Sequence, residues 1–151
     1  MRLEPGYLDW NAVFTLGANL SDSDRLECLS GDPMSVLAGA TTTGQAWTAL
    51  SPERILGAYG YTDEGTIWSL WAELSREESM AVLAHTPLWV RTLLHESGRE
   101  WLYNWVSLAN RPAIAWLKMS GCFDVSDRIV TFSGISAHYF RTKPKEVLAC
   151  V

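Results

Sequence analysis

The residues best suited to acid–base chemistry are five carboxylates in two neighbouring stretches of the chain. Asp63 and Glu64 stand in one predicted turn, and Glu73, Glu77 and Glu78 flank the start of a predicted helix. Such groups could accept the proton of a substrate amine. Turns and helix starts also favour carboxylates for structural reasons, because these positions are solvated and complement the helix dipole. The carboxylates alone therefore predict no catalytic site.

The other side chains with reactive groups are three histidines and three cysteines, namely His85, His95, His138, Cys28, Cys122 and Cys150. The histidines have no neighbours at the spacing of metal ligands, so we expect no metal site. The cysteines are odd in number and widely spaced, which excludes a disulfide framework and a zinc pattern. No glycine-flanked elbow surrounds Ser107. We interpret the cysteines as small apolar core residues of a protein made in a reducing compartment.

The composition limits the classes of partner. The chain has 151 residues, 48% hydrophobic content and a net charge of −5, which suit one folded domain and exclude a disordered chain. Its basic cluster at Arg141, Lys143 and Lys145 is too short for a surface that binds nucleic acid. No run approaches the roughly 18 apolar residues of a membrane span, and the start of the chain lacks a signal peptide. We expect a soluble protein that binds neither nucleic acid nor membrane.

Residues 101–106 predict an inner strand at the centre of the fold. Aromatic side chains alternate there with other residues, so one face would carry Trp101, Tyr103 and Trp105 and the other Leu102, Asn104 and Val106. Both faces are rich enough in apolar groups to lie mostly covered, with helices over the aromatic face. Eight tryptophans are many for a chain of this length, and core and partner surface both remain open as explanations.

A helix is expected over residues 111–120, directly after this strand. Asn110 can cap it with its side-chain oxygen, and Pro112 in the first turn wastes no hydrogen bond. Gly121 supplies the left-handed residue that ends it, with positive φ. One face of the helix carries an apolar stripe that suits packing on a sheet.

The rest of the chain predicts an α/β domain. Three short helices over 7–20, 21–29 and 32–40 precede an antiparallel meander of strands at 46–50, 54–61 and 66–73. A helix opens at Ser75, splits at Thr86-Pro87 and continues to Glu96; strands at 129–132 and 136–140 form a hairpin around Ser133-Gly134. The third strand of the meander, the helix after it and the strand at 101–106 form a parallel unit. The fold is one domain over residues 1–141, a mixed twisted sheet flanked by helices, and a loosely held tail over 142–151.

The order of elements, and the block at Asn110, Ala113, Trp116, Leu117 and Gly121, resembles the GNAT superfamily of acyl-CoA N-acyltransferases. The resemblance implies an acyl-CoA cleft formed in part by Leu74, Ser75, Arg76, Asn110 and Leu117. Leu117 stands where such enzymes usually carry a tyrosine general acid, and leucine cannot donate a proton.

A second departure lies after the third meander strand, where such enzymes place a glycine-rich loop for the pyrophosphate. Residues 74–79 read LSREES, without glycine. We expect a reciprocal cap, in which Ser75 accepts from the N–H of Glu78 and Glu78 accepts from the N–H of Ser75. Such a cap would occupy backbone N–H groups that a phosphate needs as hydrogen-bond donors.

Residues 86–123, together with HYFRTK at 138–143, are also similar to small GNAT-like internal virion or virion-assembly proteins of short-tailed bacteriophages. This resemblance implies a protein without a cofactor that binds other virion or assembly proteins, in the host cytoplasm during assembly or in the particle. The alternative is an active N-acetyltransferase, dependent on acetyl-CoA, that modifies a protein or a small amine.

Overall fold

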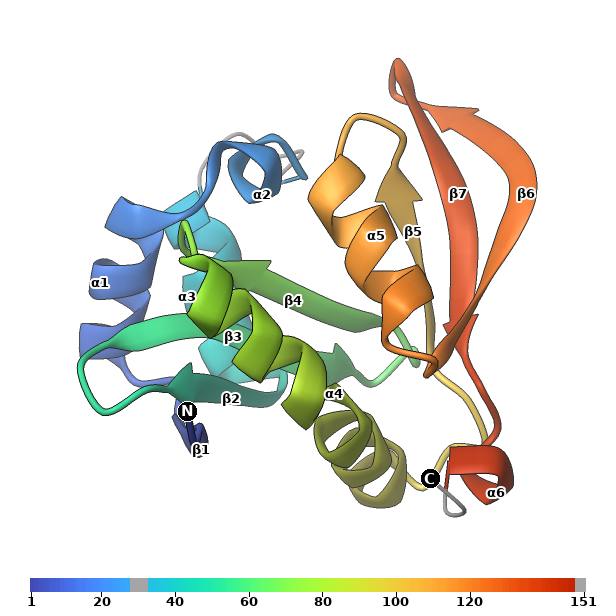
Figure 1. Cartoon of the computed structure of the whole chain (residues 1–151). Coiled ribbons are helices and arrows are strands. Elements are labelled where there is room, and N and C mark those ends of the chain that lie inside the picture. The colour runs from blue at the N-terminus through green and yellow to red at the C-terminus, as the bar shows by residue number, and fades with distance from the viewer. Residues whose placement is uncertain (28–32, 149–151) are drawn as a thin grey trace.

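A computed structural model describes residues 1–27 and 33–148 of the chain (Figure 1). Cys28 and Cys150, interpreted above as core residues, lie outside this part. The elements follow one another as β1 (Glu4–Tyr7), α1 (Trp10–Asn19), α2 (Asp22–Glu27), α3 (Pro33–Thr43), β2 (Gly44–Leu50), β3 (Ile55–Thr62), β4 (Ile67–Trp71), α4 (Arg76–Ser97), β5 (Tyr103–Ser107), α5 (Arg111–Met119), β6 (Phe123–Phe132), β7 (Ile135–Thr142) and α6 (Lys145–Leu148). This order confirms the predicted α/β arrangement.

The first sheet is antiparallel, with the strand order β1-β2-β3-β4. Its last three strands are the predicted meander. β1 was not predicted, because four residues with Pro5 and Gly6 carry little strand propensity. Proline is tolerated there since β1 forms the edge of the sheet.

The second sheet has the order β5-β7-β6 and contains the predicted hairpin. Ser133 and Gly134 turn it with φ of 48° and 74°, as a turn with two left-handed residues requires. β5 lies at the edge of this sheet, so its prediction as an inner strand is wrong. The faces alternate as expected, with Leu102 and Val106 buried, but Trp105 on the other face is 38% exposed. Trp101 on the same face is 41% exposed, so the prediction that helices cover the aromatic face is wrong. β5 and β4 belong to separate sheets.

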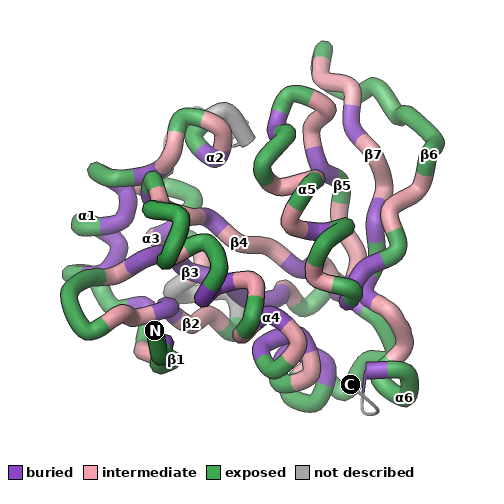
Figure 2. The backbone as a smooth tube through the Cα atoms, viewed as in Figure 1, coloured by how far each residue is buried: buried purple, intermediate pink, exposed green. Residues whose placement is uncertain are grey.

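Two apolar cores flank the first sheet (Figure 2). α1 and α3 pack on one face through Val13, Leu16 and Leu37, against the side chains of Leu70 and Ala58. α4 packs on the opposite face, and its core continues under α5 into the second sheet. The two sheets are therefore joined through one of the two cores, on the side of α4 and α5.

α4 is continuous, so the predicted break at Thr86-Pro87 is wrong. Proline removes one backbone donor, yet burial of Trp89, Val90 and Leu93 beyond it holds the helix together. It ends at Ser97, one residue beyond the predicted end at Glu96, and Gly98 caps it with φ of 67°.

Residues 143–148, which lie in the tail that the sequence predicted to be loosely held, pack against the rest of the domain. The Lys145 N–H donates to the Glu100 carbonyl at 3.2 Å, and Leu148 in α6 is fully buried. Within the described residues, no helix combines the length and apolarity needed to cross a bilayer.

Candidate active site

β4 and β5 touch at one end and separate toward the other (Figure 1). A parallel bridge joins Thr66 to Tyr103, and the Tyr103 N–H donates to the Gly65 carbonyl at 3.1 Å. One residue further, the Asn104 side chain reaches across: its Nδ2 donates to the Ile67 carbonyl at 2.7 Å, and its Oδ1 accepts from the Trp105 N–H at 2.8 Å. Asn104 thus fills the point where the strands part, and a V-shaped cleft opens beyond it.

The hydrogen-bond register decides which backbone groups of β4 face this cleft. The Ala72 N–H donates to Leu56, and the Thr62 N–H donates to Thr66, so the even-numbered residues of β4 bond β3. The odd-numbered residues turn their N–H and C=O groups toward β5. Ser69 stands in the middle of this edge, and within the described chain its N–H has no acceptor. An extended ligand with amide groups could pair with it as a neighbouring strand would.

The far end of the same edge is closed by α2. The Asp24 carboxylate accepts from the Trp71 N–H at 2.6 Å and from the Asn110 Nδ2 at 3.2 Å. Asp24 and Asn110 are 8% and 4% exposed, and the Ser21 N–H donates to the Trp71 carbonyl at 2.9 Å. Asp24 therefore ties together α2, the end of β4 and the start of α5.

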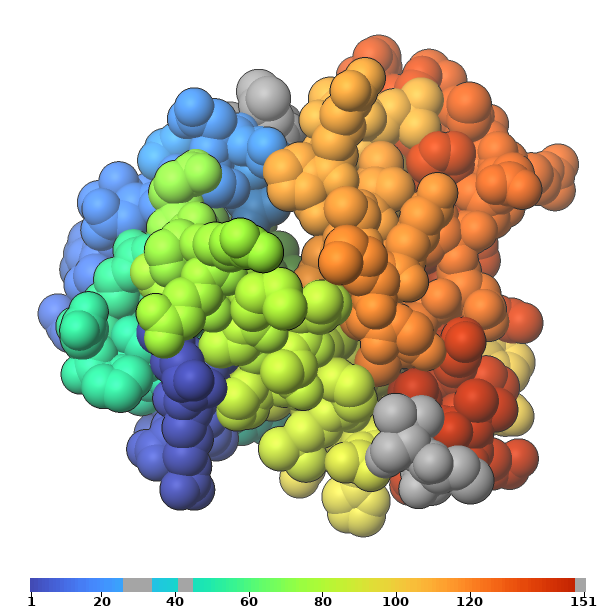
Figure 3. All heavy atoms as spheres, in the orientation of Figure 1, coloured from blue at the N-terminus to red at the C-terminus, as the bar shows by residue number. Residues whose placement is uncertain are grey.

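The cleft between these elements has a volume of about 860 Å³ and a mostly apolar wall. Figure 3 shows the surface hollowed between α4 (green) and α5 (orange). β4, β5 and α5 form its sides, and residues of α2 and of the β6–β7 hairpin extend it beyond the V. Glu73 lines it; the other four carboxylates considered above do not. A cleft of this size and shape suits a long, thin ligand with apolar segments.

The start of α4 lies beside the cleft, and half of its predicted cap is present. The Glu78 N–H donates to the Ser75 hydroxyl at 3.1 Å. The predicted return bond, from the Ser75 N–H to Glu78, is wrong. The Glu78 carboxylate instead accepts a hydrogen bond from Arg54 Nη2 at 2.6 Å. Arg54 also donates to the Glu73 carbonyl at 2.7 Å. The N–H groups of Arg76 and Glu77 have no acceptor in the described chain, so the helix start is open where the sequence predicted it closed.

The structure brings together three of the five predicted cleft residues. Leu74, Asn110 and Leu117 line the cleft, whereas Ser75 and Arg76 lie beside it at the start of α4. α5 begins as predicted, with the Ala113 N–H donating to the Asn110 Oδ1 at 3.3 Å. It ends before Gly121, whose φ of 71° confirms the predicted left-handed residue. Leu117 is buried and presents no proton donor.

Three residues with roles at the cleft were not predicted. Asp24 and Arg54 gain their roles from segments more than 15 residues away in sequence, which no local pattern reports. Ser69 could have been predicted from strand alternation. Like Ile67 and Trp71 it turns its backbone groups toward β5, and these groups stay open where β5 does not pair with β4.

Three groups with a raised pKa, those of Tyr59, Tyr61 and Cys122, are not among the residues that line the cleft. Burial raises the pKa of the Tyr59 phenol and of the Cys122 thiol, so both stay neutral at physiological pH. A buried neutral thiol is a poor nucleophile, and Cys122 behaves as the small core residue that was predicted. The described residues contain no group of three or more histidine, cysteine or acidic side chains that could hold a metal ion.

No family model matches the chain, and no curated protein is similar to it in sequence. Solved structures are similar in fold. A chimera of spermidine N-acetyltransferase SpeG from Vibrio cholerae and hSSAT has a TM-score of 0.70 at 8% identity, with 100% of both chains covered. The aminoglycoside acetyltransferase AAC(6')-Ib in complex with coenzyme A has a TM-score of 0.67 at 18% identity, covering 94% of this chain and 95% of that one.

An acetyltransferase of the GNAT family from Bacillus cereus has a TM-score of 0.65 at 14% identity and covers 95% of this chain and 98% of its own. Identities this low establish the fold alone. The diverging strands, the helix start beside them and the agreement over nearly the whole chain show that this protein has the GNAT acetyltransferase fold.

Proposed function

We propose that the chain is an N-acyltransferase that uses acetyl-CoA or a closely related thioester to acylate an amine. The observation that carries this proposal is the unpaired backbone of Ser69 at the centre of the cleft. A strand-edge N–H without a partner in the described part of the chain is available to a ligand that can pair with it as a neighbouring strand would. The pantetheine arm of coenzyme A carries amides on a thin chain, which suits this edge.

The helix start supports the same ligand. The open N–H groups of Arg76 and Glu77 and the positive end of the α4 dipole favour an anion such as a pyrophosphate. Arg54 adds a guanidinium that is 41% exposed, although its pair with Glu78 offsets part of the charge. These groups take the place of the missing glycine-rich loop.

The chemistry that acetyl-CoA brings is an activated thioester, whose acyl carbon exchanges its bond to sulfur for a bond to an amine nitrogen while the proton of the amine goes to the sulfur. Thiols have a pKa of about 8.5, so a departing thiolate needs little acid assistance near neutral pH. Water in the open cleft could serve where Leu117 cannot. We therefore expect catalysis that is slower, by up to about 10²–10⁴-fold, than with a positioned acid.

The virion-assembly role implied by the phage resemblance stays a prediction. The similar structures described above are all acetyltransferases, which favours the enzymatic alternative. Partners of the chain and its place in the cell follow from that resemblance alone.

Calorimetric titration with coenzyme A and acetyl-CoA tests the proposal. We expect saturable binding to the native chain and a loss of more than tenfold in affinity for Ser69→Pro, which lacks the N–H. Ser69→Ala is the matched control: like proline it loses the hydroxyl that accepts from Trp71 Nε1, but it keeps the backbone donor. No binding at millimolar ligand would contradict the function, and equal binding by the two variants would contradict the role of this N–H.

A further inference from the structure

We propose that the donor site prefers acyl groups of four or five carbons to acetyl, because a small apolar cavity beside Ser69 takes the end of the acyl chain. This inference rests on the proposed function and adds the donor class to it.

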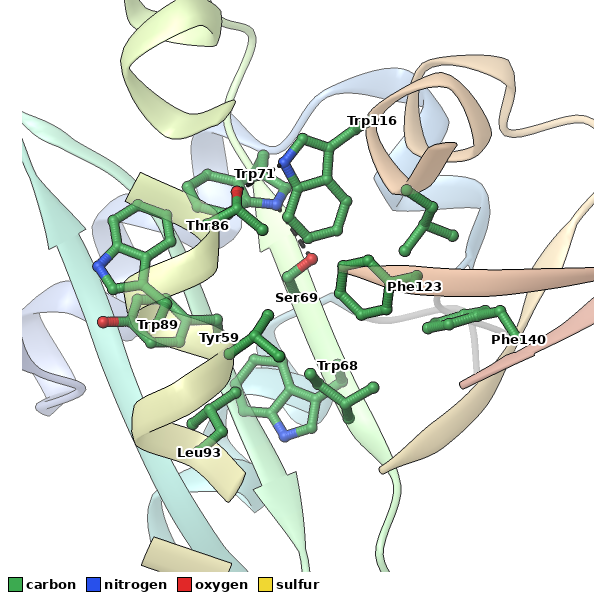
Figure 4. A pocket seen from close by; sticks show the side chains of 13 residues that line it. Tyr59, Trp68, Ser69, Trp71, Thr86, Trp89, Leu93, Trp116, Phe123 and Phe140 are labelled. Atoms are coloured by element: carbon green, nitrogen blue, oxygen red, sulfur yellow. Dashed lines mark hydrogen bonds between the residues drawn. The ribbon is translucent and has the colours of Figure 1, made fainter. Parts of the chain in front are cut away.

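The cavity has a volume of about 40 Å³ and lies between α4, α5 and the strands β3, β4, β6 and β7 (Figure 4). Phe123 and Phe140 form one side of it, and Tyr59, Trp89 and Leu93 lie opposite. Its wall and the wall of the cleft share seven residues, namely Ile67, Trp68, Ser69, Trp71, Trp116, Leu117 and Phe140. The cavity therefore adjoins the cleft, with these residues between the two spaces.

Ser69 connects the two spaces. Its backbone faces the gap between β4 and β5, while its side chain lies on the face of β4 that packs toward α4. A ligand paired with the Ser69 backbone consequently lies next to the cavity. The acyl end of a thioester is the part of such a ligand that could turn into it.

The wall of the cavity favours hydrocarbon over water. Besides aromatic and aliphatic groups it contains the hydroxyls of Ser69 and Thr86, and both are engaged. The Ser69 hydroxyl accepts from Trp71 Nε1 at 3.0 Å. Thr86 donates to the Val82 carbonyl at 2.8 Å and accepts from Trp116 Nε1 at 3.0 Å. A buried water needs two to four polar partners, and the surface of this cavity is almost entirely apolar.

Leu117 extends the apolar wall at the junction. It is 2% exposed and lines both spaces, so the junction carries a branched hydrocarbon where a hydroxyl would have offered a hydrogen bond to water. One water-sized group needs about 10–15 Å³ by the same measure of volume. The cavity thus accepts about three or four such groups, and because the acetyl methyl is one of them, about two or three methylenes beyond acetyl.

The test is a calorimetric series on the native chain with coenzyme A and its acetyl, propionyl, butyryl, pentanoyl, hexanoyl and octanoyl thioesters. Each methylene buried in an apolar site strengthens binding about fourfold. We expect the dissociation constant to fall about fourfold from acetyl to propionyl and again to butyryl, to be lowest for butyryl or pentanoyl, and to rise for hexanoyl and octanoyl, which exceed the space. Equal constants for all thioesters, or tightest binding of acetyl, would overturn the inference.

Variants of two adjacent leucines in α4 locate the effect. Leu93 lines the cavity but not the cleft, and Leu94 is equally buried but lines neither. Leu93→Val should move the preferred chain length up by one carbon, and Leu94→Val should leave it where it is. Val90→Ile, which adds a methylene to the cavity wall, should move it down by one. The same shift in both leucine variants would contradict the assignment of the cavity.

The outcomes separate this inference from the proposed function. If coenzyme A binds and its thioesters show no dependence on length, the chain remains an acyl-CoA protein and the cavity has no role in donor choice. If neither coenzyme A nor any thioester binds, both proposals fail together.

Discussion

The two edges of β4 are formed by the same five residues but differ in their backbone hydrogen bonding. Toward β3, the even-numbered residues form a regular antiparallel ladder. Toward β5, pairing consists of one bridge, the side chain of Asn104 and the carboxylate of Asp24, with Ser69 left open between them. One edge contributes to folding and the other is available for a ligand. A strand can thus be both a core element and a binding surface, with the division set by register.

Proline substitution at neighbouring positions is the sharpest way to break this comparison. Leu70→Pro removes a ladder bond and a buried side chain, and we expect a loss of at least about 3 kcal/mol in the free energy of unfolding. Ser69→Pro removes no ladder bond and should retain a cooperative transition in chemical denaturation. Equal losses for the two variants would mean that the open edge is also needed for folding.

Substitutions of Asp24 test how the far end of the β4 edge that faces β5 is held. Asp24→Ala leaves the Trp71 N–H and the Asn110 amide without this buried acceptor, which should cost about 2–4 kcal/mol. Asp24→Asn keeps one acceptor oxygen and should cost less. Denaturant unfolding of both variants measures the difference. If alanine and asparagine cost the same, the carboxylate is not what holds the end of β4.

Asn104 tests the point where the strands part. Asn104→Ala removes both of its bonds, and we expect a loss of about 1–2 kcal/mol. Asn104→Asp keeps the acceptor for the Trp105 N–H but loses the donor to the Ile67 carbonyl. A carboxylate oxygen then faces that carbonyl oxygen. A larger loss for aspartate than for alanine in urea unfolding would show that the contact with β4 is the important one. Full stability of the aspartate variant would contradict it.

Gly121 provides a control away from both edges. No atom lies within 4 Å of an added Cβ, so the cost of Gly121→Ala comes from its positive φ alone, about 1 kcal/mol. Thermal unfolding should register this loss, while calorimetry should find the affinity for coenzyme A unchanged. A change in affinity would show that destabilisation anywhere in α5 affects the cleft, and would weaken the argument from Ser69.

Local patterns predicted most of the elements because their signals are contained in a few residues. The meander, the cap at Asn110, the end at Gly121 and the turn at Ser133-Gly134 each depend on neighbours in sequence. β1 was missed because its partner β2 stabilises it, not its own composition. The break at Pro87 was wrong because the core contacts of Trp89 and Leu93 offset the lost donor.

The site was predicted less completely because it is made of contacts between distant segments. Asn110 and Leu117 were found through a motif, but Asp24 contacts Asn110 across 86 residues. The prediction that Glu78 accepts from the Ser75 N–H was wrong because Arg54, 24 residues earlier, binds the Glu78 carboxylate. Its guanidinium is a charged and therefore stronger donor. The divergence of β5 from β4 cannot be read from the sequence of either strand, because side chains alternate in the same way whether the two strands are paired or not.

Unpaired strand edges usually invite a strand of another molecule and so favour aggregation. In this chain the open stretch at Ser69 lies between α4, α5 and α2, with Asn104 at one end and Asp24 at the other. A full polypeptide strand with side chains on both faces needs neighbours about 4.8 Å apart over several residues. The recess offers one residue of open edge, so self-association through β4 is blocked sterically. The edge of β4 can therefore stay open at Ser69 for a thin ligand without offering a pairing site to a full strand.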